Sequence, residues 1–117
     1  MLFRSALLEQ LRGGVVQGIG AALFEECLYS PEGQLLNGSM ADYLVPMSAE
    51  MPDIICAHVE TPTLQSQLGA KGVGEAGTAG APGAVMNAIN DALAPTGARV
   101  TSMPFTPERI LKALAKI

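Results

Sequence analysis

A glycine-rich stretch, GAKGVGEAGTAGAPG at residues 69–83, places the strongest limit on how this chain can fold. It holds six glycines and a single acidic residue, Glu75. Each glycine costs about 0.5–1 kcal/mol relative to alanine inside a helix or strand, because its backbone loses the most freedom on folding. The stretch is therefore predicted to belong to an ordered loop, residues 62–83, that presents one carboxylate.

The composition excludes several classes of protein. The chain has 117 residues, of which 49% are hydrophobic but only 4% aromatic, so part of its packing is expected to come from elsewhere. The net charge is -4 and the basic residues are scattered, which argues against nucleic acid as a partner. The longest apolar run, VVQGIGAALF, is shorter than the roughly 20 residues of a membrane-spanning helix, so no membrane span is predicted.

The chain has two cysteines and one histidine. Cys27 and Cys56 are far apart among apolar residues and lack the spacing of a zinc or redox site, so both are predicted to be buried thiols. Free thiols are compatible with a cytoplasmic location, which we expect. His58 has no second histidine or acid at ligand spacing, and a structural or surface role is predicted for it.

The pattern of apolar residues predicts an α+β fold. Helical spacing, turn signals and alternation indicate six elements. These are a helix at 9–28, a hairpin at 27–46, a strand at 53–61, a helix at 81–95, a strand around Val100 and a C-terminal helix. Thr106 is the predicted N-cap of the last helix and Pro107 its first residue.

Gln17 has little side-chain bulk around it in the predicted first helix. Gly13, Gly14, Gly20 and Ala21 lie three or four positions away, which is the spacing of neighbours on a helix surface. Two interpretations stay open at this point. Either a bulky group approaches Gln17, or a second helix packs against these small residues.

Three interpretations of the glycine-rich stretch also remain. Residues 72–77, GVGEAG, fit the G-x-G-x-x-G pattern of dinucleotide-binding loops, but no buried strand leads into them and Pro82 is expected to delay the helix that should follow. Alternatively, the glycines let backbone lie close to a ligand while Glu75 serves as a general base. The third interpretation is a turn with a solvated Glu75.

Four motifs together resemble a known enzyme family. They are GGVVQGIGAALFEE, ADYLVPMSAEMPDI, LGAKGVGEAGTAGAPGAVMNAINDAL and MPFTPERIL, in this order. They are similar to the C-terminal part of the molybdopterin-binding large subunit of the xanthine dehydrogenase, aldehyde oxidase and carbon monoxide dehydrogenase family. Within that family, the sequences of these motifs look closest to those of aerobic carbon monoxide dehydrogenase large chains.

The resemblance implies specific roles for three residues. Glu75 matches the active-site base beside molybdenum, while Gln17 and the backbone of Gly74 match contacts to the cofactor. The implied cofactor is molybdenum bound to molybdopterin cytosine dinucleotide, shared with a part of the large subunit that lies upstream. Neither Cys27 nor Cys56 matches the cysteine that holds copper in carbon monoxide dehydrogenases.

The resemblance also implies a larger assembly. Residues 9–117 match the family, whereas residues 1–8 depart from it and are predicted to be a leader outside the family pattern, with an artefactual origin as one alternative. The expected partners are the remainder of the large subunit, separate subunits carrying [2Fe-2S] clusters and FAD, and a small-molecule substrate. The expected activity is oxidation of carbon monoxide, an aldehyde or an N-heterocycle with water as oxygen source, and the isolated chain is predicted to be inactive. The alternatives are a non-catalytic interaction module and a nucleotide-binding domain.

Overall fold

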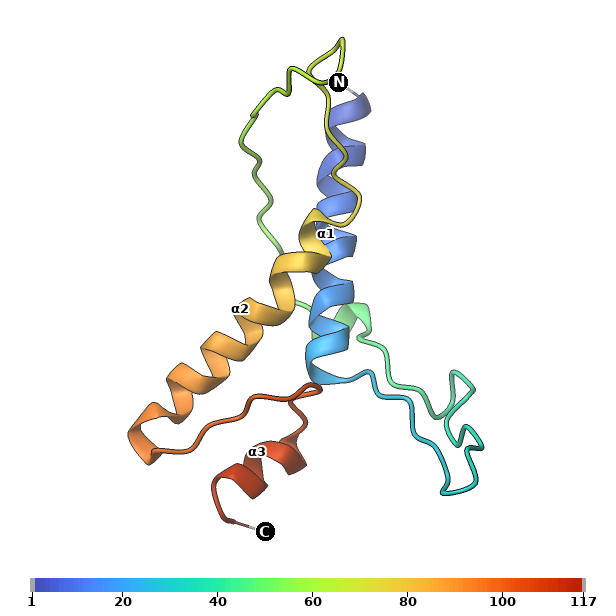
Figure 1. Cartoon of the computed structure of the whole chain (residues 1–117), viewed down its shortest axis with the longest axis vertical. Helices are drawn as coiled ribbons and strands as arrows, with labels where there is room; N and C mark the ends of the chain where they lie inside the picture. Colours follow the sequence, from blue (N-terminus) through green and yellow to red (C-terminus); the bar gives the residue numbers. More distant parts are fainter. Residues whose placement is uncertain (1, 117) are drawn as a thin grey trace.

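Three helices and long extended connections make up the chain, as seen in a computed structural model that describes residues 2–116, with side chains from residue 5 onward. The helices are α1 (Leu2–Leu23), α2 (Ala76–Leu93) and α3 (Pro107–Ala113). Two short 3-10 turns, η1 (Ser48–Glu50) and η2 (Ala94–Thr96), lie between them. Figure 1 shows α2 crossing the middle of α1 and then diverging from it, with α3 near the ends of both.

The crossing of α1 and α2 depends on glycines in both helices. A Cβ atom at Gly77 would lie 2.6 Å from the carbonyl oxygen of Leu11, which is backbone and cannot move aside easily. A Cβ atom at Gly18 would lie 2.7 Å from the Cβ atom of Ala81. The two backbones therefore approach more closely than any larger residue would allow, which explains why α1 tolerates glycines that weaken it as a helix.

A small apolar core joins the C-terminal half of the chain to the end of α1. Its buried members are Ala22, Leu93, Val100 and Phe105, and Phe105 is only 2% exposed. The amide of Phe105 donates a hydrogen bond of 2.6 Å to the carbonyl of Ala22. This core fixes the segment before α3 against the point where α1 ends.

The strands of the predicted α+β fold are not confirmed. Within residues 2–116 the structure has no strand, and the predicted hairpin is reduced to an isolated bridge between Tyr29 and Leu35. The bridge closes around a turn at Gly33, whose φ of 86° suits glycine. Beyond this bridge, the side chain of Asn37 makes the hydrogen bonds that a paired strand would make. It accepts from the Leu28 amide and donates to the Glu26 carbonyl.

The predicted strand around Val100 is replaced in a similar way. The side chain of Asn90 in α2 accepts a hydrogen bond of 2.9 Å from the Val100 amide and donates one of 2.8 Å to the Val100 carbonyl. One side-chain amide thus satisfies both polar groups that a neighbouring strand would satisfy. Val100 is buried without being part of a sheet.

The best strand candidate, residues 53–61, is extended but unpaired. No backbone–backbone hydrogen bond involves these residues, so the predicted strand is absent within the chain as described. A strand needs a partner, and no other segment of residues 2–116 lies in register beside this one.

The helices agree better with the sequence, although their bounds differ. α1 begins at Leu2 and ends at Leu23, whereas the predicted helix was 9–28, so residues 24–28 are not helical. α2 begins at Ala76, five residues before the predicted start at 81, so the final part of the predicted loop is helical. Pro82 therefore lies inside α2 and does not delay it, contrary to the expectation. At α3 the Thr106 side chain accepts from the Arg109 amide and Pro107 is the first helical residue, which confirms the predicted cap.

Both cysteines are less buried than predicted. Cys27 is exposed and Cys56 is half-buried, because the segments that carry them have few neighbours within the described part of the chain. Neither cysteine forms a disulfide. His58 lies at the surface with its Nε2 atom 3.5 Å from a Glu60 carboxylate oxygen.

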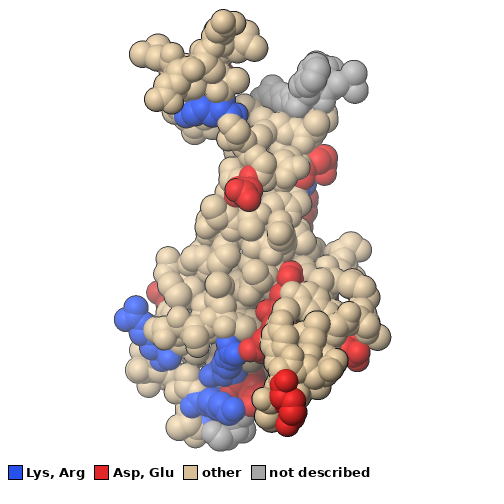
Figure 2. Space-filling model, turned by 45° about the vertical axis from the view of Figure 1, so that its right-hand side comes forward, with Lys and Arg blue, Asp and Glu red and all other residues tan. Residues whose placement is uncertain are grey.

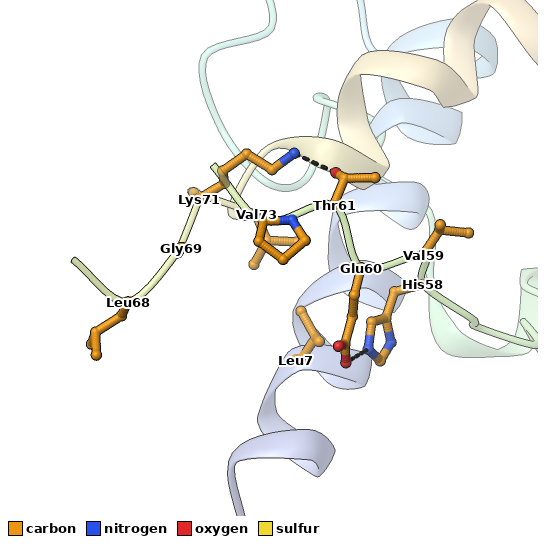
Figure 3. A pocket seen from close by; sticks show the side chains of 11 residues that line it. Leu7, His58, Val59, Glu60, Thr61, Leu68, Gly69, Lys71 and Val73 are labelled. Atoms are coloured by element: carbon orange, nitrogen blue, oxygen red, sulfur yellow. Dashed lines mark hydrogen bonds and ion pairs between the residues drawn. The ribbon is translucent and has the colours of Figure 1, made fainter. Parts of the chain in front are cut away.

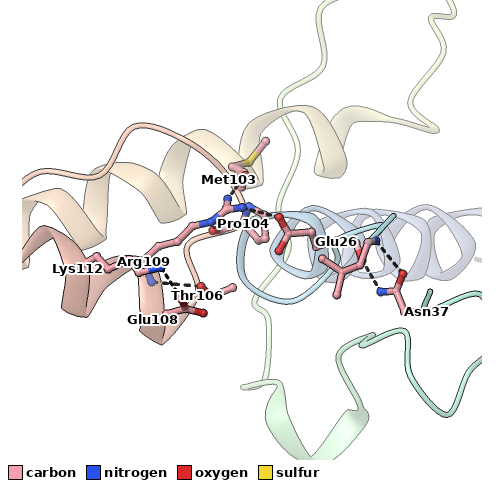
Figure 4. A network of polar contacts seen from close by, with 9 residues as sticks. Glu26, Asn37, Met103, Pro104, Thr106, Glu108, Arg109 and Lys112 are labelled. Carbon is pink, nitrogen blue, oxygen red and sulfur yellow. Dashed lines mark hydrogen bonds and ion pairs between the residues drawn. The ribbon is translucent and has the colours of Figure 1, made fainter. Parts of the chain in front are cut away.

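Polar contacts of Arg109 connect α3 to the end of α1. Its guanidinium donates to the carbonyls of Met103 and Pro104 and forms an ion pair with Glu26 (Figure 4). Glu26 in turn uses its own carbonyl to accept from Asn37 at 2.6 Å. The network holds three separate segments together at one point.

The charged side chains do not form one large patch on the face shown in Figure 2. Basic and acidic side chains lie close together at the lower end, and the middle of this face is mostly uncharged. None of the helices in the described residues is long and apolar enough to cross a membrane.

Candidate functional site

Glu75 lies at the junction between the glycine loop and α2. It occupies the N-cap position of α2 with φ of -103° and ψ of 5°, and its side chain makes no capping hydrogen bond. Its carbonyl instead accepts the first helical bond, from Ala79 at 3.0 Å. The carboxylate is therefore exposed and not engaged by the helix that begins behind it.

Two side-chain contacts between α1 and this junction hold it in place. Gln10 donates through Nε2 to the carbonyl of Gly74 at 2.9 Å. Thr78, in the first turn of α2, donates through its hydroxyl to the carbonyl of Gly14 at 3.0 Å. These bonds hold the chain on both sides of Glu75, so contacts with α1 determine the position of the Glu75 backbone.

The structure brings the three predicted site residues into one region. The Thr78 hydroxyl also donates to Oε1 of Gln17 at 3.3 Å. Gln17 therefore contacts the first turn of α2, which follows Glu75. Gly74 immediately precedes Glu75 in the chain. Gln17 and Glu75 are both exposed in the described structure, so their polar groups are accessible.

Of the two interpretations left open for the small residues around Gln17, helix packing is observed at Gly14. The space beside Gly14 is occupied by α2, since a Cβ atom at Gly14 would lie 3.2 Å from the Thr78 amide nitrogen. Gly13, by contrast, has nothing within 4 Å of such an atom. Gly20, on the same face of α1 as Gly13, is covered by Pro46 and Glu25, so the open surface beside Gln17 lies at Gly13.

The glycines of the loop divide in the same way. Gly72 and Gly74 have no atom within 4 Å of a Cβ position, so their backbone is open to an approaching group. Gly77 is different, because it faces α1 and is required by the helix crossing. One interpretation of the sequence was that the glycines of residues 72–77 let backbone lie close to a ligand. At Gly77 the neighbour is the α1 backbone instead.

The role of Thr78 and Gln10 was not predicted from the sequence. Neither residue belongs to a recognisable catalytic motif, and their partners are 64 residues away along the chain. A signal is nevertheless present for Thr78. It is the only hydrogen-bonding side chain of the first α2 turn after Glu75, and it is flanked by small residues that allow close approach to another helix.

A groove of about 550 Å³ lies beside the loop but does not include the three predicted site residues. Leu7, His58, Val59, Leu68 and Lys71 are among the residues that line it. Figure 3 shows Lys71 directed toward Thr61 and Glu60 directed toward His58, so the charged groups at its wall already have partners. No cluster of three or more potential metal-ligating side chains is found among the described residues.

The geometry disfavours a dinucleotide-binding loop. In such folds a buried strand leads into the first glycine, whereas residues 64–73 form turns and irregular structure here. The third glycine of the pattern, Gly77, is covered by α1 and does not face a phosphate site. The G-x-G-x-x-G match therefore reflects helix packing and loop geometry.

Comparison with known proteins identifies the class to which this arrangement corresponds. Residues 4–52 match the family model described as molybdopterin cofactor-binding domain. The predicted resemblance to molybdenum-binding large subunits of the xanthine dehydrogenase, aldehyde oxidase and carbon monoxide dehydrogenase type is confirmed, and it covers a short part of those subunits.

Individual relatives make the likeness more specific. The chain is 46% identical over 104 residues to the nicotine 6-hydroxylase large subunit of Paenarthrobacter nicotinovorans, covering 89% of this chain and 13% of that protein. It is 32% identical to the carbon monoxide dehydrogenase large chain of Hydrogenophaga pseudoflava, covering 90% of this chain and 13% of that protein. The crystal structure of quinoline 2-oxidoreductase from Pseudomonas putida 86 superposes with a TM-score of 0.87 at 42% identity, covering 92% of this chain and 14% of that one.

The sequence suggested that aerobic carbon monoxide dehydrogenase large chains are the most similar members of the family, and the identities can be compared with that expectation. The carbon monoxide dehydrogenase chain is a relative, but the nicotine hydroxylase subunit shares more identical residues, at 46% against 32%. The chain spans about one seventh of the length of these proteins. The likeness therefore shows the fold and a resemblance to a short part of molybdopterin-binding large subunits, and it leaves the substrate open.

Proposed function

We propose that the chain forms part of the active site of a molybdenum hydroxylase large subunit, with Glu75 as the general base. The observation that carries the proposal is the position of Glu75 at an open loop that α1 anchors through Gln10 and Thr78. A general base needs a fixed backbone and a free carboxylate, and both are present. The proposed activity is oxidation of carbon monoxide, an aldehyde or an N-heterocycle with water as oxygen source.

The proposed cofactor is molybdopterin in its cytosine dinucleotide form, and the open space near Glu75 supports a bulky group at this place. The backbone at Gly72 and Gly74 is open, and so is the α1 surface at Gly13 next to Gln17. Amide side chains and exposed backbone groups are suitable partners for the polar edge of a pterin. When bound, this cofactor would supply the metal and the electron acceptance that no side chain of the chain provides.

In this proposal each residue of the chain has a limited task. Gln17 would hydrogen-bond the cofactor with the side of its amide that does not face Thr78. The backbone of Gly74 would contact the cofactor directly, while the bond from Gln10 to its carbonyl keeps the loop from moving. Glu75 would accept a proton from the attacking oxygen nucleophile and release it to solvent after the reaction.

The proposal includes an assembly that is larger than this chain. The relatives named above are large subunits, and this chain spans a small share of each. The remainder of such a subunit would supply the other cofactor contacts and the residues that select the substrate. Iron–sulfur and flavin subunits would carry electrons away, in the cytoplasm, and the chain by itself would be inactive.

Replacing Glu75 by glutamine in a cofactor-loaded large subunit that contains this sequence tests the assignment. Glutamine keeps the size of the side chain but cannot take up a proton, so we expect turnover to fall by roughly 10²–10⁴-fold. Turnover with the substrate and the metal and pterin content are both measured. The expected result is lost activity with unchanged cofactor content.

A matched variant separates the general base from an effect of charge alone. Glu32→Gln removes one negative charge from an exposed turn far along the chain from Glu75, and it should leave turnover unchanged. Full activity in Glu75→Gln would reject the general-base role. If activity is lost together with the cofactor, Glu75 acts in cofactor binding, and the proposal of a base is again rejected.

A further inference from the structure

The segment at residues 53–61 has the properties of a sheet strand without its neighbour. It contains no helical or turn residue, and none of its amides or carbonyls takes part in a backbone–backbone hydrogen bond. Backbone polar groups that become buried are almost always paired, so a segment of this length is stable in a protein interior only with a partner. Figure 1 shows it as an irregular connection arching beside the N-terminal half of α1.

The side chains at the start of this segment alternate in burial, and residues 57–61 are all exposed. Ile54 and Cys56 are half-buried, whereas Ile55 is 93% exposed and Val59 is 88% exposed. Exposed β-branched side chains alternating with buried ones are typical of a strand that is covered on both faces. The outward face is therefore apolar surface that lacks its cover.

One edge of the segment already faces a polar group, which leaves the other edge free. Arg12 of α1 donates through Nε to the carbonyl of Ile54 at 3.0 Å. In a regular strand a residue directs its N–H and C=O to the same edge, and the next residue directs both to the opposite edge. The free edge is then the one that carries the backbone groups of Ile55, Ala57 and Val59.

Similarity to a larger solved structure indicates where a neighbouring strand could come from. The superposition with quinoline 2-oxidoreductase covers 92% of this chain at a TM-score of 0.87, and this chain accounts for only 14% of that protein. In a protein of that kind most residues lie outside the matched part, and they are candidates for the missing strand.

We propose that residues 53–61 form a strand that pairs, through the edge carrying Ile55, Ala57 and Val59, with an extended strand from the remainder of a molybdenum-binding large subunit. The added strand would satisfy the free amides and carbonyls, and its own apolar side chains would lie beside Ile55 and Val59. This is strand addition at an exposed edge, in which main-chain hydrogen bonds supply affinity and alternate side chains supply specificity. The inference depends on the proposed function only in requiring that the partner be such a subunit.

The test is association of this chain with a large subunit that lacks the matching segment. The nicotine 6-hydroxylase large subunit without that segment is a suitable partner, and both components are purified without cofactor. Amide hydrogen exchange is then followed by NMR in the free chain and in the mixture. We expect slower exchange at Ile55, Ala57 and Val59 on association, with less change at Cys56 and His58.

Two proline variants provide a matched comparison. Ala57→Pro removes an N–H from the free edge and should weaken association by about tenfold or more, because proline cannot donate to a ladder. Glu60→Pro removes an N–H from the opposite edge, where Ile54 meets Arg12, and should leave association nearly unchanged. Both sites are exposed and neither backbone takes part in a backbone–backbone hydrogen bond within the chain. Glu60→Pro also removes the carboxylate beside His58, and Glu60→Gln is therefore measured with it.

Several outcomes would overturn the inference. They are no association at all, equal loss in both variants, no loss in Ala57→Pro, and self-association of the chain that Ala57→Pro abolishes, since the occupant would then be a second copy. Because no cofactor or turnover enters this measurement, its failure is distinct from that of the Glu75 experiment. A chain that associates as expected but whose Glu75→Gln variant remains active would separate the two proposals.

Discussion

At the scale of single residues, glycines 77 and 18 contribute more to the site than their lack of a side chain suggests. They let α1 and α2 approach until Gly77 lies against the Leu11 carbonyl. That approach brings the Thr78 hydroxyl to the carbonyl of Gly14 and to the side chain of Gln17. The position of Glu75 is therefore a consequence of helix packing a few residues away.

Replacing Gly77 by alanine should destabilise this crossing. The added Cβ atom would meet backbone at 2.6 Å, so we expect the free energy of unfolding to fall by about 1–3 kcal/mol. Gly80→Ala is the control, since nothing lies within 4 Å of its Cβ position and alanine should stabilise the same helix by about 0.5–1 kcal/mol. Urea denaturation followed by circular dichroism distinguishes them, and equal effects would contradict the packing argument.

At the scale of elements, the helices were largely predictable and the strands were not. Helical spacing and caps are local, and so Thr106 was correctly placed as the cap of α3. Strand pairing is non-local, and here side-chain amides of Asn90 and Asn37 take the hydrogen bonds that neighbouring strands would take. Nothing in the alternation of apolar residues indicates that an asparagine will replace a strand.

A side-chain pair between Tyr43 and Glu25, whose strength depends on pH, connects the loop after the bridge to the end of α1. The hydroxyl of Tyr43 donates to Oε2 of Glu25 at 2.9 Å, and this hydrogen bond is the main reason why the pKa of Tyr43 is raised above its ordinary value of 10.0. A group whose pKa is raised by folding stabilises the fold below its unfolded pKa. That contribution is lost as pH rises through the raised pKa.

Replacing Glu25 by glutamine should lower the pKa of Tyr43. The chain has two tyrosines, so the measurement is made in a Tyr29→Phe background, where tyrosinate absorbance reports Tyr43 alone. The amide carries no negative charge to oppose ionisation, and we expect the midpoint to move down. Glu32→Gln is the control with no expected shift, and an unchanged midpoint in Glu25→Gln would contradict the pairing.

At the scale of the whole molecule, the described residues form an open arrangement with much exposed apolar surface. Its radius of gyration is 18.0 Å, whereas a compact domain of this length has a value of about 13 Å. The large apolar side chains of Leu64, Leu68 and Ile55 are all more than nine-tenths exposed. Both features are expected of a segment that completes its core with other parts of a larger subunit.

Small-angle X-ray scattering of the purified chain tests this openness. We expect a radius of gyration near 18 Å for the monomer. A value close to the compact figure of about 13 Å would show that the extended connections fold back onto the helices without a partner. Measurement over a concentration series is the control, because association between copies would raise the value with concentration.

Much of the candidate site was predictable because its main residues stand out from their neighbours in the sequence. Glu75 stands among glycines, and Gln17 stands among small residues on a helix, so local pattern is sufficient to select both. The roles proposed for Glu75, Gln17 and Gly74, and the division of the chain at residue 8, stay predictions. The contribution of Gln10 and Thr78 could not be predicted, since both bonds join residues that are 64 positions apart.

The sequence by itself determined the three helices, the cap of α3, the glycine loop that carries Glu75 and the resemblance to a molybdenum-binding subunit, because each depends on residues close together in the chain. The tertiary structure alone decided which glycines pack and which stay open. It also decided that asparagine side chains replace strand pairs, and that residues 53–61 stay unpaired within residues 2–116. These outcomes depend on what lies opposite each segment in space, which local sequence does not encode.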